Sequence, residues 1–222
     1  MKRSKRLIIL DLDGTLVDSL TDIAASLNYT AEELGFPTFL PDTVRSFVGD
    51  GVQVLIERAF PMDESVQKEA LPLFLNHYKT HLLDGTRLFP GIEPLLLSLK
   101  QGGFRMGVLS NKLEELSRKV VASFTGLAGS ISFVYGGDSF KEKKPSPVPI
   151  LEVMKRWGGD EENTVMIGDS PNDIFAGKAA GIHTIGVTYG FTDAEPMRAE
   201  GPDMLAANPA GIRHAIDCLI GR

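Results

Sequence analysis

The sequence predicts an α/β protein in which a parallel β-sheet forms the core and a helical domain is inserted between the first two strands. Short apolar runs of β-forming residues recur along the 222 residues, each bounded by turn residues. Segments of helical length separate most of these runs, as parallel strands require, because they are joined by crossover connections. Between the first two runs, residues 20–85 show helical patterning alone.

The sheet is predicted from five apolar runs, each long enough for one strand. They are LIIL (7–10), MGVLS (106–110), SFVYG (132–136), TVMIG (164–168) and HTIGVT (183–188). The three central runs show little alternation of polar and apolar residues, so we expect helices to cover both faces of those strands.

The helices of the core are predicted from their apolar periodicity and from the residues at their ends. A segment over 92–101 stops at a pair of glycines, and so does a segment over 147–157. A third helix begins near Pro171 and runs to Gly181.

The helical insertion has three segments, which Gly, Pro and Asp clusters separate: 20–35, 43–60 and 64–83. A simple crossover needs far fewer residues than this stretch contains. We therefore expect a Rossmann-like core made of residues 1–18 and 86–222, and a separate helical domain made of residues 19–85.

Composition excludes several classes of protein. The net charge of −6 and the pI near 5.3 argue against nucleic-acid binding, which needs a basic surface. The only cysteine, Cys218, allows neither an internal disulfide nor a zinc site of several cysteines. No apolar run is long enough for a secretory signal or a membrane span, so we expect a cytoplasmic protein whose basic start, Lys2 to Arg6, is a solvated tail.

Two carboxylates directly follow the first predicted strand, in the segment DLDGTLVDS. Ligands of open α/β sheets gather at the carboxyl ends of the strands. Asp11 and Asp13 would repel each other in a partly dry cleft, and a hard divalent cation such as Mg²⁺ would remove that repulsion. Gly14 permits the backbone turn past the site. An Asp-x-Asp pair can also simply end a strand and cap a helix, so it needs support from elsewhere in the chain.

That support comes from polar residues after the next three strands. They are Ser110 and Asn111, then Lys144, then Asp169 and Asp173. Taken alone, the serine, asparagine and aspartate residues are compatible with helix capping. Lys144 alone is compatible with a solvated lysine run that also includes Lys141 and Lys143. Their joint occurrence at successive strand ends indicates one common site, where the lysine ammonium suits a phosphate oxygen.

At these residues the sequence resembles the haloacid dehalogenase-like hydrolase superfamily. Four motifs of that superfamily occur in order: DLDGT (11–15), Ser110, Lys144-Pro145 and GDSPND (168–173). The helical insertion resembles the superfamily's helical cap. Three further segments resemble the phosphoglycolate phosphatase branch: VGDGVQVLIERAF (48–60), GGDSFKEKKPSPVPI (136–150) and AAGIHTIGVTYGF (179–191).

The resemblance implies a role for each site residue. Asp11 would be the nucleophile that forms an aspartyl-phosphate. Asp13, protonated at the start beside another carboxylate, would be general acid and then general base. Mg²⁺ would be held by the side chains of Asp11 and Asp169 and by the backbone carbonyl of Asp13. The residues expected to bind the phosphate are Ser110, Asn111, Thr15 and Lys144. Thr15 would also help to position Asp13. Asp173 would orient a water molecule or Lys144.

The cap would exclude water and select the leaving group. Its loop with Gly49, Asp50 and Gly51 is the predicted specificity element, because glycines permit close approach of the backbone. Arg45 is a candidate cation for a carboxylate on the substrate, and a solvated arginine is the alternative. We interpret His77 and His81 as a surface pair rather than a metal site, and Cys218 and Trp157 as packing residues.

The resemblance implies a Mg²⁺-dependent phosphatase of a small phosphorylated metabolite, with 2-phosphoglycolate as the first substrate to test. A phosphatase for a sugar phosphate, a nucleotide or pyrophosphate is an alternative. A β-phosphoglucomutase-like phosphosugar mutase is another, and a non-catalytic binding protein is the least favoured. We expect a monomer or homodimer that contacts neither nucleic acid nor membrane.

Overall fold

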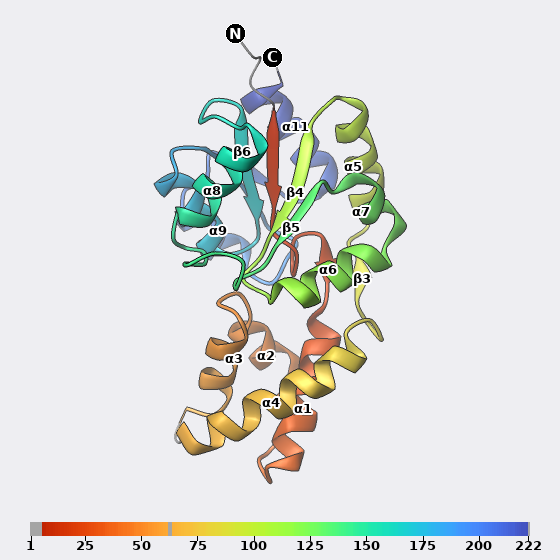
Figure 1. Cartoon of the computed structure of the whole chain (residues 1–222), viewed down its shortest axis with the longest axis vertical. Coiled ribbons are helices and arrows are strands. Elements are labelled where there is room, and N and C mark those ends of the chain that lie inside the picture. Colours follow the sequence, from red (N-terminus) through yellow and green to blue (C-terminus); the bar gives the residue numbers. More distant parts are fainter. Residues whose placement is uncertain (1–5, 62–63, 222) are drawn as a thin grey trace.

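The computed structural model describes residues 6–61 and 64–221, and in it the predicted parallel sheet is confirmed (Figure 1). Six strands lie in the order β5-β4-β1-β6-β7-β8, and all neighbours are parallel. Their bounds are β1 Leu7–Leu10, β4 Arg105–Leu109, β5 Phe133–Tyr135, β6 Thr164–Gly168, β7 His183–Val187 and β8 Met204–Ala206. The basic residues 2–5 lie outside the described residues.

The central strand β1 sets the register of the site. Leu7 pairs with Arg105 of β4 on one side and with Thr164 of β6 on the other. All four residues of β1 are fully buried, as the unbroken apolar run predicts. Because the three strands start level and run parallel, the residues that follow them meet at one edge of the sheet.

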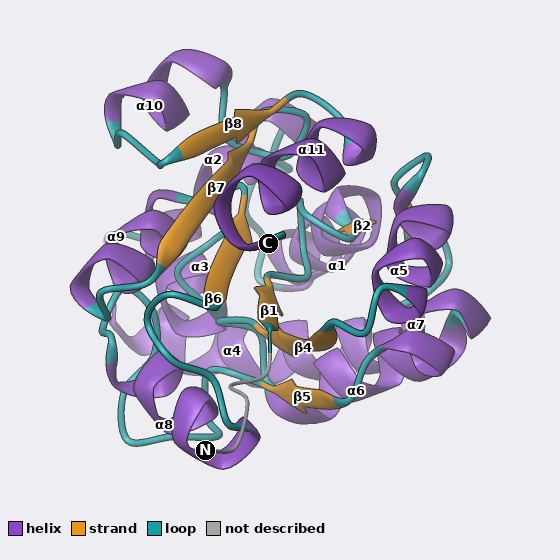
Figure 2. Ribbon diagram, turned by 90° about the horizontal axis from the view of Figure 1, so that it is seen from above, coloured by secondary structure: helices purple, strands orange, loops and turns teal. Residues whose placement is uncertain are grey.

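Helices cover both faces of the sheet (Figure 2). The odd residues of β1, Leu7 and Ile9, pack in a cluster with α8 (Val148–Trp157) and α9 (Pro171–Ala179). The even residues, Ile8 and Leu10, pack in a second cluster on the other face, which α5, α6 and α11 cover. The remaining helices of the core are α5 Ile92–Gln101, α6 Glu114–Ser123, α7 Thr125–Ser130, α10 Ala194–Ala199 and α11 Pro209–Ile220.

The helical domain lies between the short strands β2 (Val17–Asp18) and β3 (Arg87–Leu88), so the predicted insertion is confirmed. The two strands pair antiparallel and form a ribbon through which the chain leaves and re-enters the core. The domain consists of α1 Leu20–Glu33, α2 Pro41–Phe47, α3 Val52–Ala59 and α4 Glu64–His81. In Figure 1 it forms a separate lobe below the carboxyl ends of the sheet.

The middle segment of the insertion is divided into two helices at the predicted loop with Gly49, Asp50 and Gly51. Residues 43–60 form α2 and α3 with a loop between them. Gly49 and Gly51 in that loop have φ values of 120° and 88°, which a side chain would disfavour. The glycines therefore break the helix and turn the loop toward the core.

Buried polar bonds hold the ribbon end of the helical domain in place. Asp22 on α1 is 2% exposed and accepts hydrogen bonds from the amides of Gly85 and Thr86 and from the Thr86 hydroxyl, at 2.6–2.8 Å. The entry and exit of the domain are thus tied to each other. This tie makes the start of α1 and the approach to β3 one rigid unit.

Some expectations about single residues and strands are wrong. Strand β8 escaped prediction because it is only three residues long and follows Pro202-Asp203 rather than a clear apolar run. Cys218 is exposed, because it lies on the outer side of α11. Arg6, expected in a solvated tail, bonds to the Gly102 carbonyl at 2.6 Å and covers the ring of Phe104. No helix within the described ranges combines the length and apolarity needed to cross a membrane.

Candidate active site

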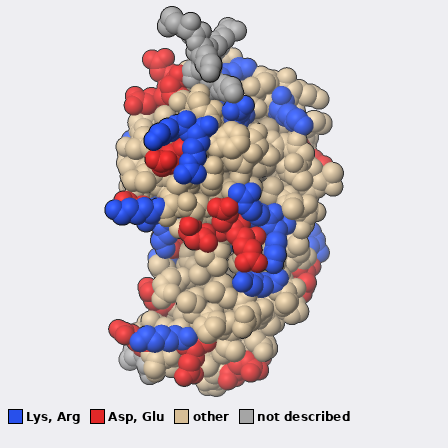
Figure 3. Space-filling view, viewed as in Figure 1, with Lys and Arg blue, Asp and Glu red and all other residues tan. Residues whose placement is uncertain are grey.

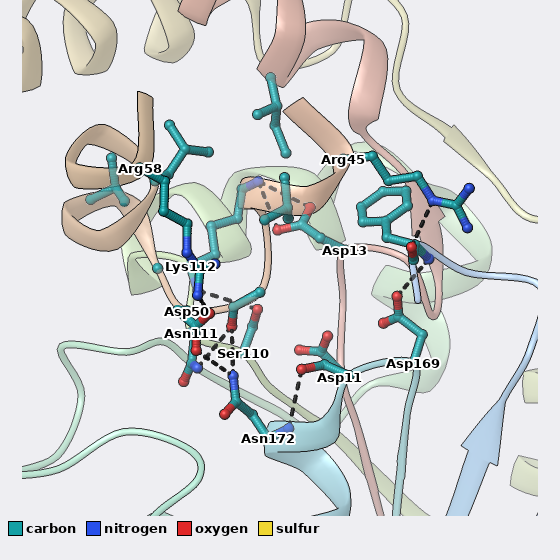
Figure 4. A pocket seen from close by; sticks show the side chains of 18 of the residues that line it. Asp11, Asp13, Arg45, Asp50, Arg58, Ser110, Asn111, Lys112, Asp169 and Asn172 are labelled. Atoms are coloured by element: carbon teal, nitrogen blue, oxygen red, sulfur yellow. Dashed lines mark hydrogen bonds and ion pairs between the residues drawn. The ribbon is translucent and has the colours of Figure 1, made fainter. Parts of the chain in front are cut away.

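The carboxyl ends of three neighbouring strands bring the predicted site residues together (Figure 4). Asp11 follows β1, Ser110 and Asn111 follow β4, and Asp169 follows β6. Lys144 arrives from the loop before α8. The site lies at this edge of the sheet, beside the loop between α2 and α3.

The Lys144 ammonium is buried among three oxygen atoms. It donates to Asp11 Oδ1 at 2.9 Å, to Asp173 Oδ1 at 2.6 Å and to the Leu109 carbonyl at 2.6 Å. Burial lowers the pKa of Lys144, but the carboxylates of Asp11 and Asp173 outweigh burial and raise that pKa above its ordinary value. Lys144 is therefore a fixed positive charge next to Asp11. The lysine is buried rather than solvated, and Asp173 is one of its hydrogen-bond acceptors.

Negative charge accumulates beside this lysine. The carboxylates of Asp11, Asp169 and Asp173 are buried, and one oxygen of each lies within 4.8 Å of the others. Burial, followed by repulsion from Asp11 and Asp173, raises the pKa of Asp169. One ammonium cannot neutralise three carboxylates, and hard oxygen donors at this spacing fit a divalent cation such as Mg²⁺.

Asp169 is held by hydrogen bonds from Thr15, which we expected to bind phosphate and support Asp13, and from the backbone of Phe191. Its Oδ1 accepts from the Thr15 hydroxyl at 3.0 Å, and its Oδ2 accepts from the Phe191 amide at 2.8 Å. Thr15 is fully buried, so in this structure it supports Asp169 and neither reaches Asp13 nor faces the cavity. Gly14, with φ 81°, turns the chain directly before Thr15.

Asp13 points away from the other carboxylates. Its Oδ1 accepts from the Ser19 hydroxyl at 2.6 Å, and both oxygens accept from the Lys112 ammonium at 3.0 Å. Lys112 also donates to the Tyr78 hydroxyl at 2.5 Å. The expected carboxylate neighbour of Asp13 is thus replaced by an ammonium.

Lys112 is the main residue that sequence reasoning missed. Its side chain is 6% exposed, and it lines the cavity. The only signal was its position directly after Ser110 and Asn111 at the end of a strand. The predicted donor Asn111 has a different task from the expected one, because its amide group donates to the backbone carbonyls of Gly49 and Lys144 at 3.0 and 2.9 Å. Ser110 is buried and lines the cavity as expected.

The loop between α2 and α3 contacts the core directly. Asn172 donates to the side chain of Asp50 at 2.7 Å, and Lys143 donates to the Asp50 carbonyl at 2.5 Å. Lys143, which we predicted to be solvated, is instead half-buried and bound to this carbonyl. Arg58 on α3 pairs with the same Asp50 at 2.6 Å. On the face seen in Figure 3, acidic and basic side chains gather at this junction between the two parts of the molecule.

Arg45 forms a second bridge from the helical domain to the core. Its guanidinium donates to the carbonyls of Phe191 and Gly190 at 2.6 and 3.3 Å and pairs with Asp193 at 3.0 Å. It is therefore neither freely solvated nor available as an unpaired cation. Its contacts and those of Asp50 close opposite sides of a cavity of about 390 Å³, which Asp11, Asp13 and Asp169 line from the core side.

The two histidines of α4 contact each other and neighbouring polar side chains. The rings of His77 and His81 stack at 4.2 Å, and His81 bonds to Asp84. Neither belongs to the cluster of potential metal ligands found in the described part of the chain. Trp157, predicted as packing, stacks on Phe133 at 4.7 Å.

A parallel α/β core that carries its acidic site under an inserted helical lobe defines a class of capped hydrolases. The family profile described as haloacid dehalogenase-like hydrolase matches residues 8–187, and the chain belongs to this family. The phosphoglycolate phosphatase of Colwellia psychrerythraea is 39% identical over 208 residues, 90% of this chain and 92% of that protein. The phosphoglycolate phosphatase of Aquifex aeolicus is 37% identical over 212 residues, which are 96% of this chain and 97% of that protein. The crystal structure of a predicted phosphoglycolate phosphatase from Haemophilus somnus has a TM-score of 0.90 at 30% identity, covering 97% of this chain and 99% of that one.

Proposed function

We propose that the protein is a Mg²⁺-dependent phosphatase of a small phosphate monoester, with 2-phosphoglycolate as its substrate. The observation that carries the proposal is the position of Asp11, whose carboxylate faces a capped cavity and accepts from the buried Lys144 ammonium at 2.9 Å. Similar chains over nearly the whole length are named phosphoglycolate phosphatase, which supports the choice of substrate.

Mg²⁺ would be held by the side chains of Asp11 and Asp169 and by the backbone carbonyl of Asp13. When bound, it would supply positive charge against the phosphate oxygens and against the excess of buried carboxylates. Asp173, which accepts from Lys144 and from the Ser170 amide, would keep that lysine aimed at Asp11. Thr15 and the Phe191 amide would fix the orientation of Asp169.

The nucleophile of the proposed reaction is Asp11. One of its oxygens forms a bond to phosphorus while the bond from phosphorus to the leaving oxygen breaks, which gives an aspartyl-phosphate. Lys144 lowers the repulsion between this carboxylate and the phosphate dianion. Ser110, buried at the end of β4, would donate its hydroxyl to the phosphoryl group.

Asp13 would pass a proton to the leaving oxygen and then take one from the water that hydrolyses the intermediate. Water attack breaks the bond between Asp11 and phosphorus and releases inorganic phosphate. For the first step, Lys112 has to release part of its contact with Asp13, because an ammonium and a proton compete for the same carboxylate oxygens.

The cap in this proposal is formed by residues 19–85, and residues 1–18 and 86–222 form the catalytic core. Gly49, Asp50 and Gly51 would close over the leaving group and exclude water. Gly51 lies so close to the core that an added Cβ would come within 2.9 Å of the Asn111 carbonyl.

The proposal is tested by measuring inorganic phosphate released from a panel of phosphate monoesters with Mg²⁺ and with EDTA. We expect turnover with Mg²⁺ alone and the highest kcat/KM for 2-phosphoglycolate. Preference for a sugar phosphate or a nucleotide would replace the substrate, and sugar-phosphate isomerisation that needs a bisphosphate activator would indicate a mutase. No turnover of any ester would contradict the proposed enzyme.

A further inference from the structure

The cation Lys112 lies on the leaving-group side of the site. The proposed acid Asp13 must reach the leaving oxygen within hydrogen-bond distance, and the Lys112 ammonium is 3.0 Å from both oxygens of Asp13. In 2-phosphoglycolate the carboxylate carbon is only two bonds from the leaving oxygen. A leaving oxygen held by Asp13 therefore brings the substrate carboxylate within reach of Lys112.

The other basic side chains around the cavity are committed to the protein. Among the described residues that line it, the only lysines and arginines are Lys112, Arg45 and Arg58. Arg45 is bound to two backbone carbonyls and Asp193, and Arg58 to Asp50 and the Phe47 carbonyl. Lys144 lies behind Asp11, on the phosphate side. Lys112 is thus the basic group best placed for a second anionic group.

The surroundings of Lys112 favour a strong ion pair. Its side chain is 6% exposed, and apolar residues of the cap, including Ile23, Phe74 and Leu75, line the cavity beside it. Charge pairs are stronger where water is excluded. An ammonium has three N–H donors, and two of them serve the same carboxylate in Asp13. One of these bonds can pass to a substrate oxygen while the other keeps Asp13 in place.

We infer that Lys112, seated against Tyr78 of the cap, binds the carboxylate of the substrate and sets the preference for phosphate esters of hydroxy acids. The inference rests on the proposed function and deepens it. Tyr78 accepts from the ammonium at 2.5 Å, and its ring centroid lies 4.6 Å from Nζ. Because Tyr78 belongs to α4, the cation is positioned for the leaving group only when the cap lies against the core.

The test compares two phosphate esters of similar length, 2-phosphoglycolate and 2-hydroxyethyl phosphate, in which an uncharged hydroxymethyl group replaces the carboxylate. In the wild-type enzyme we expect a clear preference for 2-phosphoglycolate. Lys112→Met should lower the ratio of the two kcat/KM values roughly 100-fold, since a hydrogen-bonded charge pair is lost. Lys112→Arg should keep most of the ratio. Lys100→Met is the control, because Lys100 is exposed, bonds to the Gly129 carbonyl and does not line the cavity, and it should leave the ratio unchanged.

A residue that merely positions Asp13 would slow both substrates equally, so an unchanged ratio in Lys112→Met would overturn the inference. Equal turnover of the two substrates by the wild type would overturn it as well, and the phosphatase itself would stand. If the wild type turns over no ester, the proposed function fails separately.

A binding measurement tests whether Lys112 recognises the carboxylate, whatever the outcome of the kinetic comparison. The Asp11→Asn variant is titrated calorimetrically with 2-phosphoglycolate and with inorganic phosphate, in the presence of Mg²⁺. Adding Lys112→Met should weaken 2-phosphoglycolate binding by at least about tenfold and leave phosphate binding unchanged. Equal weakening of both ligands, or of neither, would contradict carboxylate recognition. Circular dichroism and thermal unfolding check that each variant is folded.

Discussion

Replacing Asp11 by asparagine should abolish turnover and leave the protein as stable as before, or slightly more stable. The side chain keeps its size and can still accept a hydrogen bond from Lys144, but it loses the charge that the proposed nucleophile needs. Its loss also relieves the crowding of buried carboxylates, because Asp11 lies within 4.8 Å of both Asp169 and Asp173.

The size of the stability effect follows from the distances. With an effective dielectric constant of about 20, two unit charges 4.8 Å apart repel by about 3.5 kcal/mol, and Asp11 has two such neighbours. Its attraction to Lys144 at 2.9 Å is worth about 6 kcal/mol on the same scale. The two repulsions together exceed the attraction by about 1 kcal/mol, which corresponds to an increase of about 2–4 °C in Tm for a chain of this length.

The assay is urea unfolding in EDTA at about pH 9, where these buried carboxyl groups are largely ionised. Phosphate release with Mg²⁺ is measured on the same preparations. Glu162→Gln, at an exposed position away from the cavity, is the control and should change neither quantity. The reasoning is refuted if Asp11→Asn lowers the free energy of unfolding by more than about 2 kcal/mol, or if it retains more than about a few per cent of the wild-type rate.

Four further results are expected. Burial and nearby carboxylates raise the pKa of Asp169 to about 8, so the Tm in EDTA should fall as pH rises toward about 9. The increase in Tm on adding Mg²⁺ should be larger at about pH 9 than at about pH 6, because at the lower pH the metal has to displace the proton of Asp169. A pH-independent increase in Tm would contradict this. Gly14→Ala should inactivate the enzyme and lower the free energy of unfolding in urea by about 1–2 kcal/mol. The reason is that the φ of Gly14 is 81° and an added Cβ would lie 2.1 Å from Asp169 Oδ2. Wild-type activity of this variant would contradict the close fit. Asn172→Ala removes the bond to Asp50 and should lower kcat/KM for 2-phosphoglycolate about fivefold, and unchanged kinetics would exclude a role in cap closure.

The sheet and its insertion could be predicted because they depend on patterns local in the sequence. The run LIIL is too apolar for any place but a central strand, and it is fully buried in β1. The glycine pairs after 92–101 and 147–157 marked the ends of α5 and α8. Strand β8 could not be found in this way, since its pairing with β7 supplies most of what makes it a strand.

The candidate site was predictable in its residue types but less so in its pairings. Topology alone brings Asp11 and Asp169 to one edge, because both follow parallel strands, and Lys144 reaches them from the loop between β5 and α8. The partner of Asp13 depends on where Lys112 and α4 of the cap lie in the fold, and neither position is encoded near residue 13. Lys112 could therefore be recognised only after the cap and core were seen in contact.

The β2–β3 ribbon has a consequence for how such an enzyme can diversify. Both passages of the chain between the two lobes run side by side through residues 17–18 and 87–88. A foreign insert spliced at this neck would arrive with its two ends already adjacent, and the strand ends that carry the carboxylates would stay intact. New leaving groups can thus be recruited by exchanging one lobe, while the chemistry at phosphorus is inherited unchanged.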